Sequence, residues 1–159
     1  IFHPFMECNC LFLDVEVFRD IGQADERFDL PGGGALNLCI YRKAAMHPHT
    51  RSFMLPGEGS FHQLHGGVTT SEVEERETIL NRQREQLTEL LGESFRSPTV
   101  EPILLGKVPG PALRYLKHSV ERGMHRVQRC AERQEDMYAD ERLKEGARRG
   151  VLGATSGLQ

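Results

Sequence analysis

Two histidines stand three residues apart in the glycine-rich stretch LPGEGSFHQLHGG, which spans residues 55–67. Imidazoles at positions i and i+3 can bind one cation from a turn or helix, but not from a regular strand, where side chains alternate between faces. Glu58 could add an oxygen ligand to His62 and His65, and the glycines allow backbone amides to approach an anion such as a diphosphate. The spacing leaves open a purely structural turn whose histidines bind backbone carbonyls.

A second set of candidates is the acidic segment QADERFD and the glycines that follow it. Asp25, Glu26 and Asp29 could act as general acids or bases, or they could cap the next element from a solvated loop. Proline and glycine after this segment break regular structure, so a loop that can approach a ligand is expected. Its glycines are Gly32, Gly33 and Gly34.

The elements that must hold these candidates follow from the spacing of the apolar residues. The apolar run at residues 8–15 predicts a buried strand, and a short helix is expected at residues 15–21. The segment ALNLCIYRKAAM predicts a helix because apolar residues recur on one face at four-residue spacing. Residues 51–55 then predict a short strand that leads into the histidine motif.

The second half of the chain is predicted to be helical. The segment VTTSEVEERETILNRQREQLTELLG predicts a long, charged helix, with a Thr or Ser cap followed by glutamate three or four residues later. Residues 96–112 contain four prolines and two glycines, which predicts an extended connector. A last helix is expected at residues 111–144, and the glycine-rich tail at residues 145–159 is expected to be disordered.

Composition limits the partners that fit this chain. The 20 Lys and Arg residues are nearly balanced by 23 Asp and Glu residues, and aromatic residues make up only 7% of the chain, so nucleic acid is not an expected partner. No apolar run reaches the roughly 18 residues that a membrane helix needs. The four cysteines form no C-x-x-C pair, which favours a reduced, cytoplasmic setting.

The order of these motifs resembles a known enzyme family. The string NCLFLDVEVFRDIGQADERFDLPGGG, followed by a helix, a strand and GEGSFHQ-HGG, is similar to the second half of family-2-like glycosyltransferases with the GT-A fold. The resemblance implies that a sugar is transferred from a nucleotide-sugar donor to an acceptor of unknown identity. It also implies a divalent metal, Mn or Mg, that would neutralise the diphosphate leaving group.

The resemblance assigns roles to particular residues. His62 and His65 would hold the metal or contact the diphosphate, and Asp25 and Glu26 would be catalytic residues near the acceptor hydroxyl. The resemblance also implies four cofactor-binding residues. These are Gly32, Gly33, Gly34 and Glu58.

Two features depart from the family pattern. The donor-binding half with its DxD metal motif would precede Ile1, so the chain is expected to be a fragment that is inactive alone. The acidic pair that inverting members carry as GGED is replaced by Gly33, Gly34 and Ala35. The base would then come from Asp25 or Glu58, or the reaction would retain configuration, or the domain would be inactive.

The sequence therefore predicts an α/β fold: a partial GT-A-like domain with a helical C-terminal extension. Residues 1–70 would be the acceptor-side half, residues 71–144 the helical extension and residues 145–159 the tail. Two other functions stay open. One is a small cupin-like domain that binds metal through Glu58, His62 and His65, and the other is a non-catalytic module whose long helices pair with a partner or with a second copy.

Overall fold

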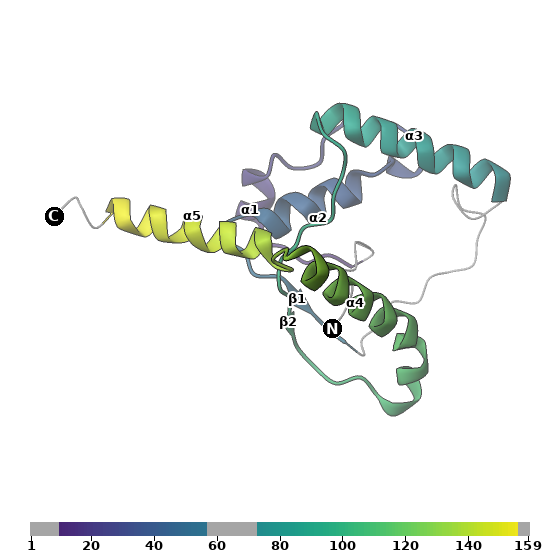
Figure 1. Cartoon of the computed structure of the whole chain (residues 1–159). Helices are drawn as coiled ribbons and strands as arrows, with labels where there is room; N and C mark the ends of the chain where they lie inside the picture. The colour runs from purple at the N-terminus through teal and green to yellow at the C-terminus, as the bar shows by residue number, and fades with distance from the viewer. Residues whose placement is uncertain (1–9, 57–72, 156–159) are drawn as a thin grey trace. The chain divides into compact units, whose positions relative to one another are not determined.

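The computed structural model describes residues 10–56 and 73–155, and this part of the chain is mostly helical (Figure 1). Its only sheet is a parallel pair of two-residue strands, β1 and β2, with Phe53 opposite Ile103 and Met54 opposite Leu104. The elements in chain order are α1 (Val15–Asp20), the 3₁₀ helix η1 (Pro31–Gly33), α2 (Leu36–Met46), β1 (Phe53–Met54), α3 (Val73–Leu91), β2 (Ile103–Leu104), the 3₁₀ helix η2 (Gly110–Ala112), α4 (Leu113–Arg133) and α5 (Ala139–Thr155).

The predicted α/β fold, a partial GT-A-like domain, is therefore wrong for the described residues. Such a domain needs a sheet of several strands covered by helices, and one pair of two-residue strands does not provide it. The apolar run before α1 forms no strand over residues 10–14. One reason is local: the Asp14 side chain accepts a hydrogen bond of 2.7 Å from the Glu16 amide, which caps α1 and starts a helix directly after the run.

The described chain divides into two compact units, and the first comprises residues 10–44 and 73–97. Its core is a small cluster to which α2 contributes Cys39 and α3 contributes Leu87, and both residues are almost fully buried. Phe28 and Ala35 complete this cluster. Partly buried apolar residues pack around it: Leu36, Leu38, Leu90, Leu91 and Phe95. The predicted helices over ALNLCIYRKAAM and the segment after Gly67 thus form, and their apolar faces meet in this unit.

The second unit comprises residues 45–56 and 98–155, and it contains β1, β2, α4 and α5. The single helix expected at residues 111–144 is two helices. Gln134 has left-handed backbone angles (φ 54°, ψ 33°) and ends α4, and a short turn leads into α5. α5 extends to Thr155, so most of the segment expected to be a disordered tail is helical.

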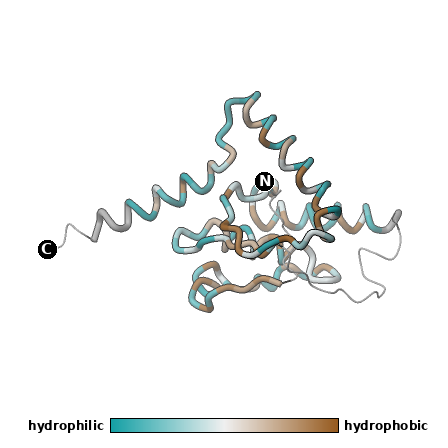
Figure 2. Tube along the Cα trace, turned by 90° about the horizontal axis from the view of Figure 1, so that it is seen from below, coloured by the Kyte–Doolittle hydropathy of each residue, from teal (hydrophilic) through white to brown (hydrophobic). Residues whose placement is uncertain are grey.

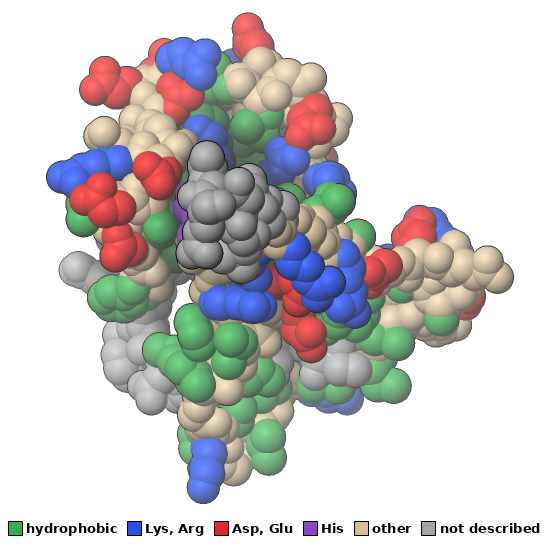
Figure 3. Space-filling view, turned by 90° about the vertical axis from the view of Figure 1, so that its left-hand side faces the viewer, with side chains coloured by type: hydrophobic (Ala, Val, Ile, Leu, Met, Phe, Trp, Pro, Cys, Tyr) green, Lys and Arg blue, Asp and Glu red, His purple; other side chains and the backbone are tan. Residues whose placement is uncertain are grey.

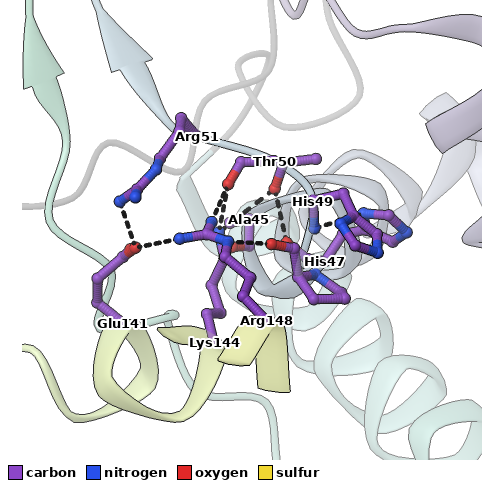
Figure 4. Close-up of polar contacts among 9 residues, drawn as sticks. Ala45, His47, His49, Thr50, Arg51, Glu141, Lys144 and Arg148 are labelled. Atoms are coloured by element: carbon purple, nitrogen blue, oxygen red, sulfur yellow. Dashed lines mark hydrogen bonds and ion pairs between the residues drawn. The ribbon is translucent and has the colours of Figure 1, made fainter. Parts of the chain in front are cut away.

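A buried cation holds the second unit together (Figure 4). Lys144 of α5 is only 2% exposed, and its Nζ donates to the carbonyl oxygens of Ala45 at 2.7 Å and Thr50 at 3.1 Å. Arg148, one helical turn later, donates to the carbonyl oxygens of Pro48 and Thr50. The chain leaving a helix carries carbonyl groups without intrahelical partners, and here α5 supplies their donors.

Carboxylates on α5 balance this buried positive charge. Glu141 Oε1 lies 3.1 Å from Arg51 Nη1 and 3.5 Å from Arg148 Nη1. Burial lowers the pKa of Lys144 below its usual value, and the charge of Glu141 opposes that shift. At the start of α5, the Thr99 amide donates to Asp140 Oδ2 at 2.7 Å while the Asp140 amide donates to Thr99 Oγ1 at 3.0 Å. Residues 45–51, which lead into β1, are therefore fixed to α5 by charged hydrogen bonds.

We expect Lys144→Met to destabilise the chain by about 1–3 kcal/mol, because the carbonyl groups that Lys144 binds would stay buried with fewer donors. Chemical denaturation followed by circular dichroism measures this change. The matched control is Arg149→Met, at an exposed position on the same helix, which should change stability by less than about 0.5 kcal/mol. Equal effects of the two substitutions would contradict the role given to Lys144.

Candidate functional site

The described candidate site is the turn from Asp25 to Gly34 in the first unit. It contains five of the eight residues that the sequence assigned to the site. The other three, Glu58, His62 and His65, lie outside the described residues, so the metal and diphosphate contacts assigned to them stay predictions. Within residues 10–56 and 73–155, no group of three or more His, Cys, Asp or Glu side chains is arranged to hold a metal ion.

Asp25 is bound by Arg27 in a two-point ion pair. Asp25 Oδ1 accepts from Arg27 Nε at 2.9 Å, and Oδ2 accepts from Arg27 Nη2 at 2.7 Å. The Arg27 backbone amide also donates to Oδ1 at 3.1 Å, and the Phe28 amide donates to the Asp25 carbonyl at 3.1 Å. This is a tight turn closed by its own carboxylate.

The ion pair determines the protonation state of Asp25. The hydrogen bonds from the Arg27 side chain and then from its amide lower the pKa of Asp25 to about 2. A carboxylate with this pKa is ionised at neutral pH and is a weak proton acceptor. Asp25 therefore fits the role of a fixed negative charge better than that of a general base.

Glu26, the next residue, is in a different situation. Its side chain is exposed, and no side chain or amide in the described part of the chain binds its carboxylate. The Arg27 guanidinium directs its hydrogen bonds to Asp25, so these bonds do not neutralise the Glu26 carboxylate. The turn thus presents one bound carboxylate and, beside it, one carboxylate that is available to a ligand.

Gln86 of α3 attaches this turn to the core of the unit. Its Nε2 donates to Asp29 Oδ1 at 2.7 Å and to the Arg27 carbonyl at 3.2 Å. Phe28, between these two residues, inserts into the apolar core. Gln86 is not predictable from the sequence, because a glutamine in a charged helix shows no pattern that links it to a turn 57 residues earlier.

The glycine loop is constrained by its backbone angles. Gly32, Gly33 and Gly34 have φ values of 76°, 78° and 56°, a region that disfavours other residues. Gly34 is also confined sterically, because a Cβ there would lie 2.9 Å from Gln86 Oε1. That oxygen is buried and has no hydrogen-bond partner among the residues that the structure describes. The loop can therefore bring its backbone close to a neighbour, and its conformation depends on glycine.

Cys39 is a free, buried thiol in the core of the first unit. Burial raises the pKa of Cys39, and the charge of Lys43 acts against that shift. A thiol in this setting is protonated at neutral pH, and only the thiolate is a strong nucleophile. The turn therefore offers carboxylate chemistry rather than thiol chemistry.

Comparison with known proteins gives no family assignment. No protein-family model, no curated protein and no solved structure matches this chain.

We expect Arg27→Met to raise the pKa of Asp25 from about 2 toward the ordinary value of 3.8, because the substitution removes the side-chain hydrogen bonds that lower it. A depressed carboxyl pKa stabilises the fold above pH 3.8, and this contribution is lost as the pH falls toward 2. Carboxyl NMR titration measures the midpoint, and Arg19→Met on α1 is the control. A midpoint that stays near 2 in Arg27→Met would assign the shift to the backbone amide alone.

We expect Gly34→Ala to destabilise the chain by about 1–3 kcal/mol, because the backbone angles disfavour alanine and the new methyl group would displace Gln86. Gly33→Ala has a positive φ but open space around the position, so its expected cost is about 1 kcal/mol. Thermal unfolding of both variants, repeated in a Gln86→Ala background, separates strain from clash. If Gln86→Ala does not reduce the cost of Gly34→Ala, the clash is not the cause.

Proposed function

We propose that this chain contributes the acceptor side of a glycosyltransferase that uses a nucleotide-sugar donor. One observation carries the proposal: the Asp25–Arg27 pair leaves Glu26 available six residues before Gly32, the first of three glycines with positive φ. The same segment, DERFDLPGGG, carries the resemblance to family-2-like glycosyltransferases. The proposal rests on this local segment and not on an overall GT-A fold.

In the proposed reaction, Glu26 accepts the proton of the acceptor hydroxyl. The acceptor oxygen then forms a bond to the anomeric carbon of the donor sugar, while the bond from that carbon to the diphosphate oxygen breaks. The nucleoside diphosphate leaves with the electron pair of the broken bond. Asp25 stays ionised and fixes the turn through Arg27, and the glycine loop offers backbone groups to the acceptor.

A divalent cation would supply charge neutralisation at the leaving diphosphate. Its proposed ligands are His62 and His65, which lie outside the described residues. The proton transfer and the positioning of the acceptor are therefore assigned only to residues of the turn. The cupin-like alternative receives less support. It requires a barrel of alternating strands, and the described residues contain a single pair of two-residue strands.

The test is a sugar-transfer assay on the natural full-length protein, using a panel of nucleotide sugars and simple sugar acceptors with release of nucleoside diphosphate as the readout. We expect Glu26→Gln to lower kcat by about 10²-fold or more, because the proton acceptor is lost. Glu85→Gln, an exposed carboxylate on α3, is the matched control and should keep kcat within about twofold. Unchanged kcat in Glu26→Gln, or no transfer with any donor, would refute the proposal.

A further inference from the structure

The net charge of the chain is small because its two units carry net charges of opposite sign. The described part of the second unit contains twelve Lys and Arg residues against eight Asp and Glu residues, whereas the described part of the first unit contains eight against twelve. Within these residues, α4 alone has six basic residues and two acidic ones, and the rest of the described part of the unit is balanced at six and six. The whole positive surplus of the second unit is therefore on one helix.

The same helix exposes an apolar stripe. Leu113, Val120 and Met124 are spaced by seven and four residues, which places them on one face. They are 57%, 42% and 63% exposed. Figure 2 shows hydrophobic and hydrophilic residues alternating along α4. Figure 3 shows one face of the molecule, on which hydrophobic side chains lie among Lys, Arg, Asp and Glu side chains. Three large apolar side chains aligned on a charged helix form a patch that is stabilised when a partner buries it away from water.

The cations of α4 differ in what they bind: Arg126 donates to the Met137 carbonyl, and Arg133 pairs with Glu135 at 3.9 Å. Lys117 lies beside the apolar stripe with a side chain that is 81% exposed, and its nearest carboxylate, Glu121, is 3.9 Å away. Arg122 and Arg129 are exposed and form no ion pair or hydrogen bond with any part of the chain that the structure describes. The helix thus combines uncompensated positive charge with an open apolar face.

We propose that α4 binds the surface of an anionic lipid bilayer, with its axis parallel to the membrane plane. A bilayer that contains acidic lipids offers both an apolar interior for the stripe and negative headgroups for the cations. Nucleic acid would complement the charge but leave the apolar stripe in water. The binding is peripheral, since no helix in residues 10–56 and 73–155 is long and apolar enough to cross a membrane.

The dimensions of α4 suit this arrangement. Its 21 residues give a length of about 30 Å, and the stripe runs along its first half. Lys117, within the same turns, can extend its ammonium group toward headgroups while its methylene chain follows the stripe. Arg122 and Arg129, nine and sixteen residues after Leu113, lie on the face of the helix opposite the stripe, so they act on headgroups only through an electrostatic attraction that salt screens within about 10 Å.

The test is co-sedimentation of the full chain with vesicles of pure phosphatidylcholine and with vesicles that contain one third phosphatidylglycerol. We expect binding to the anionic vesicles, little binding to the neutral ones, and release in 0.5 M salt. Met124→Asp should weaken binding about tenfold, because it puts a charge in the apolar stripe. The triple substitution Lys117→Gln, Arg122→Gln and Arg129→Gln should weaken it at least tenfold.

Leu143→Asp is the matched control, because Leu143 is 65% exposed on α5 and so resembles Met124 in exposure but not in location. It should bind vesicles like the unmodified chain. Equal loss in Met124→Asp and Leu143→Asp, or equal binding to neutral and anionic vesicles, would overturn the proposal. So would absence of vesicle binding together with a dimer that Met124→Asp dissociates, since the stripe would then belong to an interface with a second copy.

Discussion

The fold of the second unit depends on hydrogen-bond donors for carbonyl groups in residues 45–51. This segment turns between α2 and β1, and its carbonyls cannot be satisfied by a sheet, because β1 is only two residues long. Lys144 and Arg148 of α5 donate to the carbonyls of Ala45, Pro48 and Thr50. A charged donor is stronger than a neutral one, but its burial is costly unless a countercharge is close. Glu141 provides that countercharge on the same helix, so the position of α5 follows from the turn that it binds.

The first unit solves the same problem with a neutral side chain. Gln86 donates to the Arg27 carbonyl and to Asp29, and it thereby attaches the candidate turn to α3. The Asp25 carboxylate is satisfied within the turn itself, so only the outer side of the turn carries an available acidic group, Glu26. Rigidity at Asp25 and availability at Glu26 are thus two consequences of one ion pair. The turn is therefore held by its own hydrogen bonds and by Gln86 of α3 rather than by a sheet.

Sequence periodicity predicted the helices but not the contacts that orient them. The helices α1, α2 and α3 form close to the expected segments, because their apolar residues recur at helical spacing. The break between α4 and α5 was not predicted, since Gln134 is a residue that rarely adopts left-handed angles and no glycine or proline marks the turn. The α/β prediction was wrong because an apolar run can precede a cap as well as form a strand. Asp25 and Glu26 were identified from their residue types, but only the geometry separates a bound carboxylate from an available one.

The separation of charge between the units has a physical consequence that the total composition hides. A net charge of −3 predicts little attraction to an anionic surface if the charge is spread evenly. Screening limits each charge to its own neighbourhood, so a surface responds to the local surplus and not to the total. On α4 that surplus of positive charge coincides with exposed apolar side chains, which water solvates poorly. An interface that is both apolar and negative therefore complements α4, although the chain as a whole is acidic.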